Sequence, residues 1–268
     1  TLRRSVLSPG MQKAADHRKA AFGASCTSHI VQDGLSSAIN VLLPILAQTF
    51  GLSYAQVGLL RGVKSLVQAV VEVSSGWLAE RTGEAHLLVI GLTMSGLGYV
   101  GLAAAPDILV IALCLAIVGA GTGLHHAPSS ALIALAYRAQ GRSGALGLYN
   151  ASGDVGKLAF TAGVSLAIGA GLAWHGFSLI YGLGAVGAGV ATLIVTRRLR
   201  AFQKGGGGAE AADGDVEGWG ILNWRAFATL LGVTGLDTIV QNAVLLFVAF
   251  LMLAKGLPLY LATAATVI

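Results

Sequence analysis

The chain has 268 residues, of which 55% are hydrophobic and only 11% are charged, and its formal net charge is +5. Soluble domains are about 25% charged, so this composition excludes an ordinary soluble globule, and the high apolar content excludes low-complexity disorder. Cys26 and Cys114 are the only cysteines, which excludes a disulfide-stapled secreted scaffold. The composition therefore indicates a polytopic helical membrane protein.

Long apolar stretches recur along the chain, and crossing a hydrocarbon core of about 30 Å takes roughly 20 such residues. Residues 1–28 are predicted to be a cytoplasmic N-terminal segment, and the glycine-rich, then acidic stretch 199–225 a cytoplasmic linker. A six-helix bundle is expected over 29–198, and the truncated start of a second bundle over 226–268. The seven complete spans lie at 30–50, 57–79, 86–105, 109–135, 145–173, 177–196 and 226–253, and an eighth begins near Leu257.

Lysine and arginine residues are concentrated in alternate connections between these spans. Thirteen lie in the N-terminal segment, the loops after the second and fourth spans, and the linker region, whereas Lys255 alone lies in the opposite loops. The positive-inside rule then places the N-terminus and the linker on the cytoplasmic side of a bacterial inner membrane. Topology thus accounts for the positive charge, and no nucleic-acid partner is expected.

The start of the seventh span repeats the start of the first. Asp33 is followed by Gly51-Leu52-Ser53-Tyr54, and about 204 residues later Asp237 is followed by Gly256-Leu257-Pro258-Leu259-Tyr260. Six helices, a linker and a parallel restart are typical of a two-bundle transporter. Because the chain begins at a residue other than Met and stops inside an apolar run, we expect it to be a fragment of a longer protein.

Seven ionisable residues other than histidine lie within the predicted spans, where exposure to lipid at the membrane centre costs ~2.5–3.5 kcal/mol for each. At 100° per residue, most of them share a narrow helix face with neighbouring polar residues. Such polar stripes are predicted to line a hydrated cavity. The stripes on the first, second and fifth spans are His29, Asp33, Ser36 and Asn40; Arg61, Lys64, Gln68 and Glu72; and Asn150, Asp154, Lys157 and Thr161.

Carboxylates inside a membrane are candidate proton carriers, because removal from water favours the protonated form. The candidates are Asp33, Glu72, Asp154 and Asp237, with Asp33 first. Three alternatives stay open: a structural Asp154–Lys157 pair, snorkelling of Arg61 and Lys64 to the surface, and a packing role for the adjacent histidines. The residues predicted to line the solute path are His29, Asn40, Arg61, Lys64, Gln68, His125, His126, Asn150 and Lys157.

Sequence patterns of cofactor and enzyme chemistry are missing from the chain. It has no Walker A sequence, no Gly-x-Ser-x-Gly, no His-Glu-x-x-His and no Cys-x-x-Cys. The neighbours His125 and His126 point about 100° apart, so they are not expected to chelate one metal ion. We therefore predict neither an enzyme nor a metal or cofactor site.

Residues 76–83, between the second and third predicted spans, resemble the Gly-x-Leu-Ala-Asp-Arg-x-Gly signature of the major facilitator superfamily. The sequence departs from that signature at Glu80, which replaces Asp, and at Glu84-Ala85, which replace a basic pair. In the family this loop forms a charged latch that stabilises one access state. The resemblance implies that gating role for the matching residues Gly76, Leu78, Glu80, Arg81 and Gly83.

A second resemblance is to the fosmidomycin-resistance-like branch of that superfamily. It is carried by Ser28-His29, Asp33, Leu42-Leu43-Pro44 and Gly51 to Leu59, and further along by His126-Ala127-Pro128, Gly141-Arg142-Ser143 and Gly153 to Gly156. The resemblance implies an all-α fold of twelve helices in two bundles, alternating access in a lipid bilayer, and proton-coupled efflux of a small organic solute.

Arg61, Lys64 and Glu72 are not features of that branch, and they suggest an anionic solute. Proton-coupled import of an anionic nutrient is therefore an alternative function. A non-transporting membrane sensor or assembly protein on the same fold is a second alternative. The sequence makes no prediction of the oligomeric state.

Overall fold

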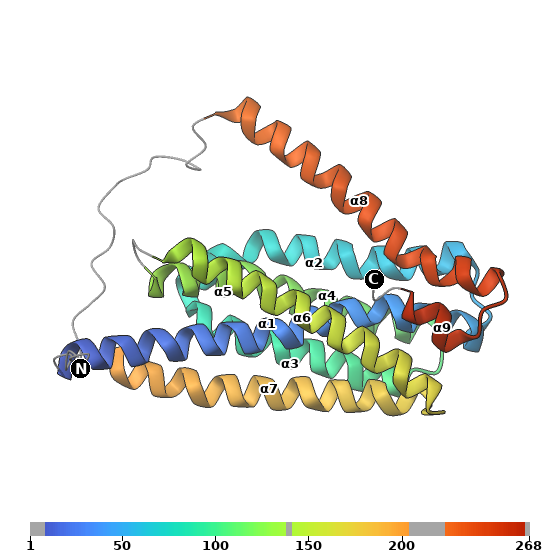
Figure 1. Cartoon of the computed structure of the whole chain (residues 1–268), viewed down its shortest axis with the longest axis horizontal. Helices are drawn as coiled ribbons and strands as arrows, with labels where there is room; N and C mark the ends of the chain where they lie inside the picture. The colour runs from blue at the N-terminus through green and yellow to red at the C-terminus, as the bar shows by residue number, and fades with distance from the viewer. Residues whose placement is uncertain (1–8, 138–140, 204–222, 266–268) are drawn as a thin grey trace, which may run out of the picture.

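The computed structural model describes residues 9–137, 141–203 and 223–265, and these residues form helices and short connections without a β-strand. This confirms the expected all-α class. Most of the helices run side by side along one axis, and α8 diverges from them toward its N-terminal end (Figure 1). The described helices are α1 (Pro9–Phe50), α2 (Tyr54–Thr82), α3 (Glu84–Ala103), α4 (Ile108–Gly123), α5 (His126–Ala136), α6 (Arg142–Gly169), α7 (Trp174–Gln203), α8 (Trp224–Ala254) and α9 (Leu259–Ala264).

Five stretches of the described helices are long and apolar enough to cross a membrane: Arg18–Phe50, Glu84–Ala103, Ile108–Ala134, Trp174–Arg197 and Trp224–Ala254. Helices α2 and α6 have sufficient length, with 29 and 28 residues, but polar side chains keep them out of this set. These two helices carry the second and third predicted polar stripes. Two of the three helices expected to line a cavity are therefore too polar to count as apolar spans.

The fourth predicted span, at 109–135, is two helices and not one. Helix α4 ends at Gly123, and the N–H of His125 donates to the carbonyl of Thr122, one residue nearer than in an α-helix. Pro128 explains the break, because it has no N–H to donate to the Leu124 carbonyl and its ring crowds that carbonyl.

Helices α1 and α7 extend the furthest beyond their predicted ends. Helix α1 begins at Pro9 and continues into the first span, so the predicted N-terminal segment is helical wherever it is described. Ala21, Ser25 and Ser28 of this extension are buried, because such small side chains let neighbouring helices approach. Helix α7 continues to Gln203, and residues 204–222 of the predicted linker lie outside the described residues.

The apolar core lies along α1, where large side chains such as Leu35, Leu42 and Leu46 are fully buried. Close helix contacts surround it. A Cβ atom placed on Gly96 of α3 would lie 2.7 Å from the carbonyl oxygen of Gly182 on α7, and the reverse distance is also 2.7 Å. Only glycine fits both positions, so α3 and α7 pack backbone against backbone.

Candidate functional site

A polar cavity of about 440 Å³ lies between α1, α2, α5, α6 and α8. Of its sixteen lining residues, all but Ala69 and Leu245 are polar or charged. The polar stripes of α1 and α2 face one another across it. The polar lining is Asp33, Ser36, Ser37, Asn40, Arg61, Lys64, Ser65, Gln68, Glu72, His126, Lys157, Thr238, Gln241 and Asn242.

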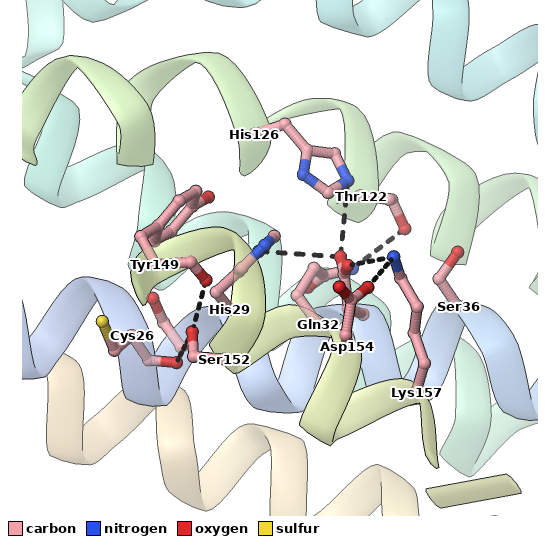
Figure 2. A network of polar contacts seen from close by, with 12 residues as sticks. Cys26, His29, Gln32, Ser36, Thr122, His126, Tyr149, Ser152, Asp154 and Lys157 are labelled. Atoms are coloured by element: carbon pink, nitrogen blue, oxygen red, sulfur yellow. Dashed lines mark hydrogen bonds and ion pairs between the residues drawn. The ribbon is translucent and has the colours of Figure 1, made fainter. Parts of the chain in front are cut away.

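The carboxylate of Asp33 is the centre of one side of the cavity. Its oxygens lie 3.4 Å from Lys157 Nζ, 3.6 Å from His29 Nδ1 and 3.7 Å from His126 Nε2. Lys157 Nζ also donates to Asp154 Oδ1 at 2.9 Å. In Figure 2 the side chains of His29, His126 and Lys157 converge from three different helices. We call these five residues the Asp33 cluster.

Two glycines of α6 make this convergence possible. A Cβ on Gly153 would lie 2.8 Å from Asp33 Oδ2 and would collide with the His29 ring, and a Cβ on Gly156 would collide with the backbone carbonyl of Ile30. Helix α6 therefore approaches α1 more closely than a side chain would allow. That approach brings Lys157, one residue after Gly156, within reach of Asp33.

Aromatic contacts hold His29 in place. Its ring stacks on Tyr149 of α6, with ring centroids 4.0 Å apart and planes 14° apart, and it lies parallel to His125 at 5.8 Å. His125 is fully buried behind the cavity, whereas its neighbour His126 lines it. The two adjacent histidines therefore have different surroundings, one in the interior and one in the cavity, as their separation of about 100° around the helix axis allows.

The opposite side of the cavity is formed by α2, and we call Arg61 and Lys64 the basic wall. Lys64 is only 2% exposed, and its Nζ donates to Ser36 Oγ at 2.6 Å and to Gln68 Oε1 at 2.7 Å. Arg61 Nη2 donates to Asn242 Oδ1 of α8 at 2.6 Å. Among the described residues, no carboxylate lies within 4.0 Å of either cation. Lys64 therefore points inward, and its partners are neutral.

Several predicted site residues lie outside the cavity lining. Asn150 and Asp237 are exposed, Asp154 is exposed but paired with Lys157, and His29 and His125 are buried next to the lining. The structure brings the remaining predicted residues together as lining. These are Asp33, Glu72, Asn40, Arg61, Lys64, Gln68, His126 and Lys157.

Other contributors were not predicted from the sequence. Thr238, Gln241 and Asn242 line the cavity from α8, and their spacing of three and four residues is the signal that could have identified them. Gln32 Nε2, next to the cluster, donates to Ser95 Oγ at 2.8 Å and to Thr122 Oγ1 at 2.9 Å. These buried bonds tie α1 to α3 and α4.

The predicted latch is mostly helical. Residues 76–82 form the last two turns of α2, and Gly83, with φ +85°, makes the whole connection to α3. The Arg81 guanidinium lies 3.8 Å from the centre of the Trp77 ring, and both Glu80 and Arg81 are exposed. These residues are therefore placed at one end of the bundle, away from the cavity.

Part of the Asp33 cluster has the composition of a metal site. Ligand atoms of His29, Asp33 and His126 all lie within 4.8 Å of one another. Two imidazoles and a carboxylate are common ligands of transition-metal ions. However, the Lys157 ammonium lies 3.4 Å from the same carboxylate, so Asp33 already has a cationic partner.

Curated relatives match part of the chain. It is 31% identical over 131 residues to the uncharacterized MFS-type transporter YfnC of Bacillus subtilis (strain 168). The aligned region is 48% of this chain and 31% of YfnC. The chain is 28% identical over 137 residues to the fosmidomycin resistance protein of Escherichia coli (strain K12), with an aligned region of 51% and 33%. The matched regions thus span about a third of these relatives, none of which is named as an enzyme.

Solved structures share the fold. The tetrameric PepTSo2 structure has a TM-score of 0.56 and 14% identity, over 85% of this chain and 49% of that one. A bacterial homologue of the human drug peptide transporters PepT1 and PepT2 has a TM-score of 0.57 and 15% identity, over 85% and 50%. At this identity the likeness concerns the fold alone.

The family model of the Major Facilitator Superfamily matches residues 26–267, which is most of the chain. The match includes the first-bundle helices, the latch residues and both sides of the polar cavity. It confirms the family predicted from the sequence. The chain is an integral membrane protein and belongs to the Major Facilitator Superfamily.

Proposed function

We propose that this chain is part of a proton-coupled secondary transporter that exports a small organic solute by alternating access. The observation that carries the proposal is the Asp33 cluster, in which one buried carboxylate contacts Lys157, His29 and His126 at the edge of a polar cavity. Family membership supports transport, and the name of the relative fosmidomycin resistance protein supports export.

The mechanism follows from the charge on Asp33. When the carboxylate is ionised, it attracts Lys157 and holds α6 against α1. Protonation cancels that charge, which frees Lys157 to pair with Asp154 alone. A conformation that requires α1 and α6 to shift then becomes easier to reach. Solute in the cavity biases the same equilibrium, and coupling results when proton and solute favour opposite states.

The proposed orientation follows the distribution of basic residues. Residues 1–28 and the linker region lie in the cytoplasm, and the membrane is the bacterial inner membrane. The latch at the end of α2 then faces the cytoplasm, where Glu80 and Arg81 stabilise one access state.

The test uses the whole protein reconstituted in liposomes with a pH-sensitive dye inside. Fosmidomycin is the first probe, because of the relative's name, and a small-molecule extract of bacterial cytosol is the second. We expect a probe to trigger proton flux in the wild type, and Asp33→Asn to abolish it. The control is Asp237→Asn, since this exposed carboxylate lies outside the cavity lining.

Two results would contradict the proposal. If Asp33→Asn keeps the wild-type flux, Asp33 does not carry the proton. If the wild type moves protons with neither probe, the protein is not a proton-coupled transporter of these solutes, and the non-transporting alternative gains support. The sign of the flux separates export from import: solute added outside makes the interior more alkaline if the protein exchanges solute for protons, and more acidic if it carries both together.

A further inference from the structure

The basic wall contains one buried cation, Lys64, and one partly buried cation, Arg61, and the hydrogen-bond partners of both are neutral. Lys64 Nζ bonds to a hydroxyl and an amide oxygen, and Arg61 Nη2 bonds to an amide oxygen. Withdrawing a charge from water costs several kcal/mol per ion, so buried cations normally lie beside an anion. In the described part of the chain, neither has one within 4.0 Å.

Arg61 has further unused hydrogen-bonding capacity. Its Nε and Nη1 atoms are buried and have no hydrogen-bond acceptor among the described residues. The side chain nevertheless lines the polar cavity. A guanidinium binds carboxylate and phosphate oxygens through several N–H groups at once, so these donors suit an anion.

The carboxylates of the cavity make no direct contact with the basic wall. Asp33 is engaged by Lys157 on the opposite side. Glu72 lies eight residues beyond Lys64 on the same helix, which is about 12 Å along the axis. The lining carries three basic side chains and two carboxylates, and a third carboxylate, Asp154, pairs with Lys157 from just outside the lining. Asp33 and Glu72 attract Lys64 only from beyond 4.0 Å, so an anion in direct contact with the basic wall would have to come from outside the described residues.

We propose that Arg61 and Lys64 bind an anionic group of the solute, a carboxylate or a phosphoryl group. The inference rests on the transport function proposed above and specifies its substrate class. Arg61 and Lys64 are three residues apart and so share one face of α2, where one anion can contact both. A cationic solute would be repelled from this wall, and a neutral one would leave both charges uncompensated.

The test is equilibrium binding, measured as the thermal unfolding midpoint of the whole purified protein at constant ionic strength. The probes are acetate for a carboxylate, inorganic phosphate for a phosphoryl group, and acetamide as a neutral match for acetate. We expect a saturable rise in Tm with acetate or phosphate and none with acetamide. Whichever anion acts at lower concentration identifies the chemical group.

Variants locate the binding to the basic wall. Arg61→Gln and Lys64→Gln are expected to weaken the anion response at least tenfold, whereas Lys64→Arg retains it because the charge remains. Lys255→Gln is the matched control, since this lysine is exposed and lies outside the cavity. If a glutamine variant fails to fold, the wild-type comparison of acetate, phosphate and acetamide still decides whether an anion is preferred.

An equal response to acetamide, or no response to either anion, would overturn the inference. An anion response that survives in both glutamine variants would overturn it too. The liposome assay separates this failure from failure of the proposed function. Proton flux without anion binding contradicts only the anion site, and anion binding without proton flux contradicts only transport.

Discussion

On the α6 side of the cavity, the Asp33 carboxylate meets Lys157 and two imidazoles, whereas on the α2 side Arg61 and Lys64 meet only hydroxyl and amide groups. The first side has oppositely charged groups in direct contact, whereas the carboxylates nearest to the second side attract Lys64 only from beyond 4.0 Å. A compensated cluster can change state when one proton arrives. An uncompensated wall is instead ready to accept an anion. The comparison divides proton handling and solute binding between two faces of one cavity.

The sharpest test of this division is a crossed pair of variants. Asp33→Asn is expected to abolish proton flux but to keep the Tm response to anions, because the basic wall is intact. Arg61→Gln is expected to weaken the Tm response to anions at least tenfold but to keep proton flux, because Asp33 retains its partners. The liposome assay and the unfolding assay are run on both proteins. If both variants lose both properties equally, the cavity is one inseparable site.

The close approach of α6 to α1 can be broken at Gly156. In Gly156→Ala, the added methyl group collides with the Ile30 carbonyl, so α6 must move away and Lys157 loses its reach to Asp33. Overpacking of this kind costs about 1–3 kcal/mol. We expect a lower Tm and reduced proton flux.

Gly144→Ala is the control on the same helix, because a Cβ there has nothing within 4 Å. It is expected to be neutral, or stabilising by up to about 1 kcal/mol through helix propensity. Equal losses in the two alanine variants would show that the contact with Ile30 is not what positions α6.

Removing one lysine from each side compares the two charge environments directly. Lys157→Met leaves the carboxylates of Asp33 and Asp154 without their cation. Lys64→Met leaves only a neutral hydroxyl and a neutral amide without their hydrogen-bond donor. Because Lys157 is half-exposed, we expect its loss to cost about 1–2 kcal/mol, less than for a fully buried pair. Lys64→Met is expected to cost less than Lys157→Met when no anion is present.

Chemical denaturation without added anions measures both free energies of unfolding. Adding Asp33→Asn to Lys157→Met should restore part of the loss, because it removes one stranded carboxylate. A larger cost for Lys64→Met than for Lys157→Met would reverse the assignment of the compensated and uncompensated sides.

The smallest effect is expected at Ser36, which provides one of the two hydrogen-bond partners of Lys64. Ser36→Ala removes that acceptor and should cost about 0.5–1.5 kcal/mol. Ser37→Ala is the matched control, since Ser37 lines the same cavity without a hydrogen bond to Lys64. Equal unfolding free energies for the two variants would mean that Ser36 contributes nothing to holding Lys64.

Most of the helical layout could be predicted from hydrophobic runs, because the length of an apolar stretch is a local property. The fourth span shows the limit of that argument. Hydropathy alone predicts one helix over 109–135, but the structure has two helices there, which end at Gly123 and begin at His126. Pro128 is the sequence signal for this break, because a proline leaves the carbonyl four residues before it without a helical N–H partner.

The candidate site, like the helices, could be predicted only in part from the sequence. Polar spacing predicted the α1 and α2 stripes, which now line the cavity, but it also selected Asn150 and Asp237, which are exposed. Tyr149 was missed, because nothing in its local pattern indicates that its ring stacks on His29. A stripe shows which helix face avoids lipid, and it carries no information about the partner that this face meets.

By itself, the amino-acid sequence determined that the chain is a helical membrane protein with polar faces on otherwise apolar spans. Composition, run length and a 3.6-residue period are properties of neighbouring residues. Only the tertiary structure decided that Lys157 reaches Asp33 while Arg61 and Lys64 have no carboxylate partner. Those distances depend on how closely two helices approach. That approach is set where a glycine meets the backbone of a distant helix, as Gly156 of α6 meets the Ile30 carbonyl of α1.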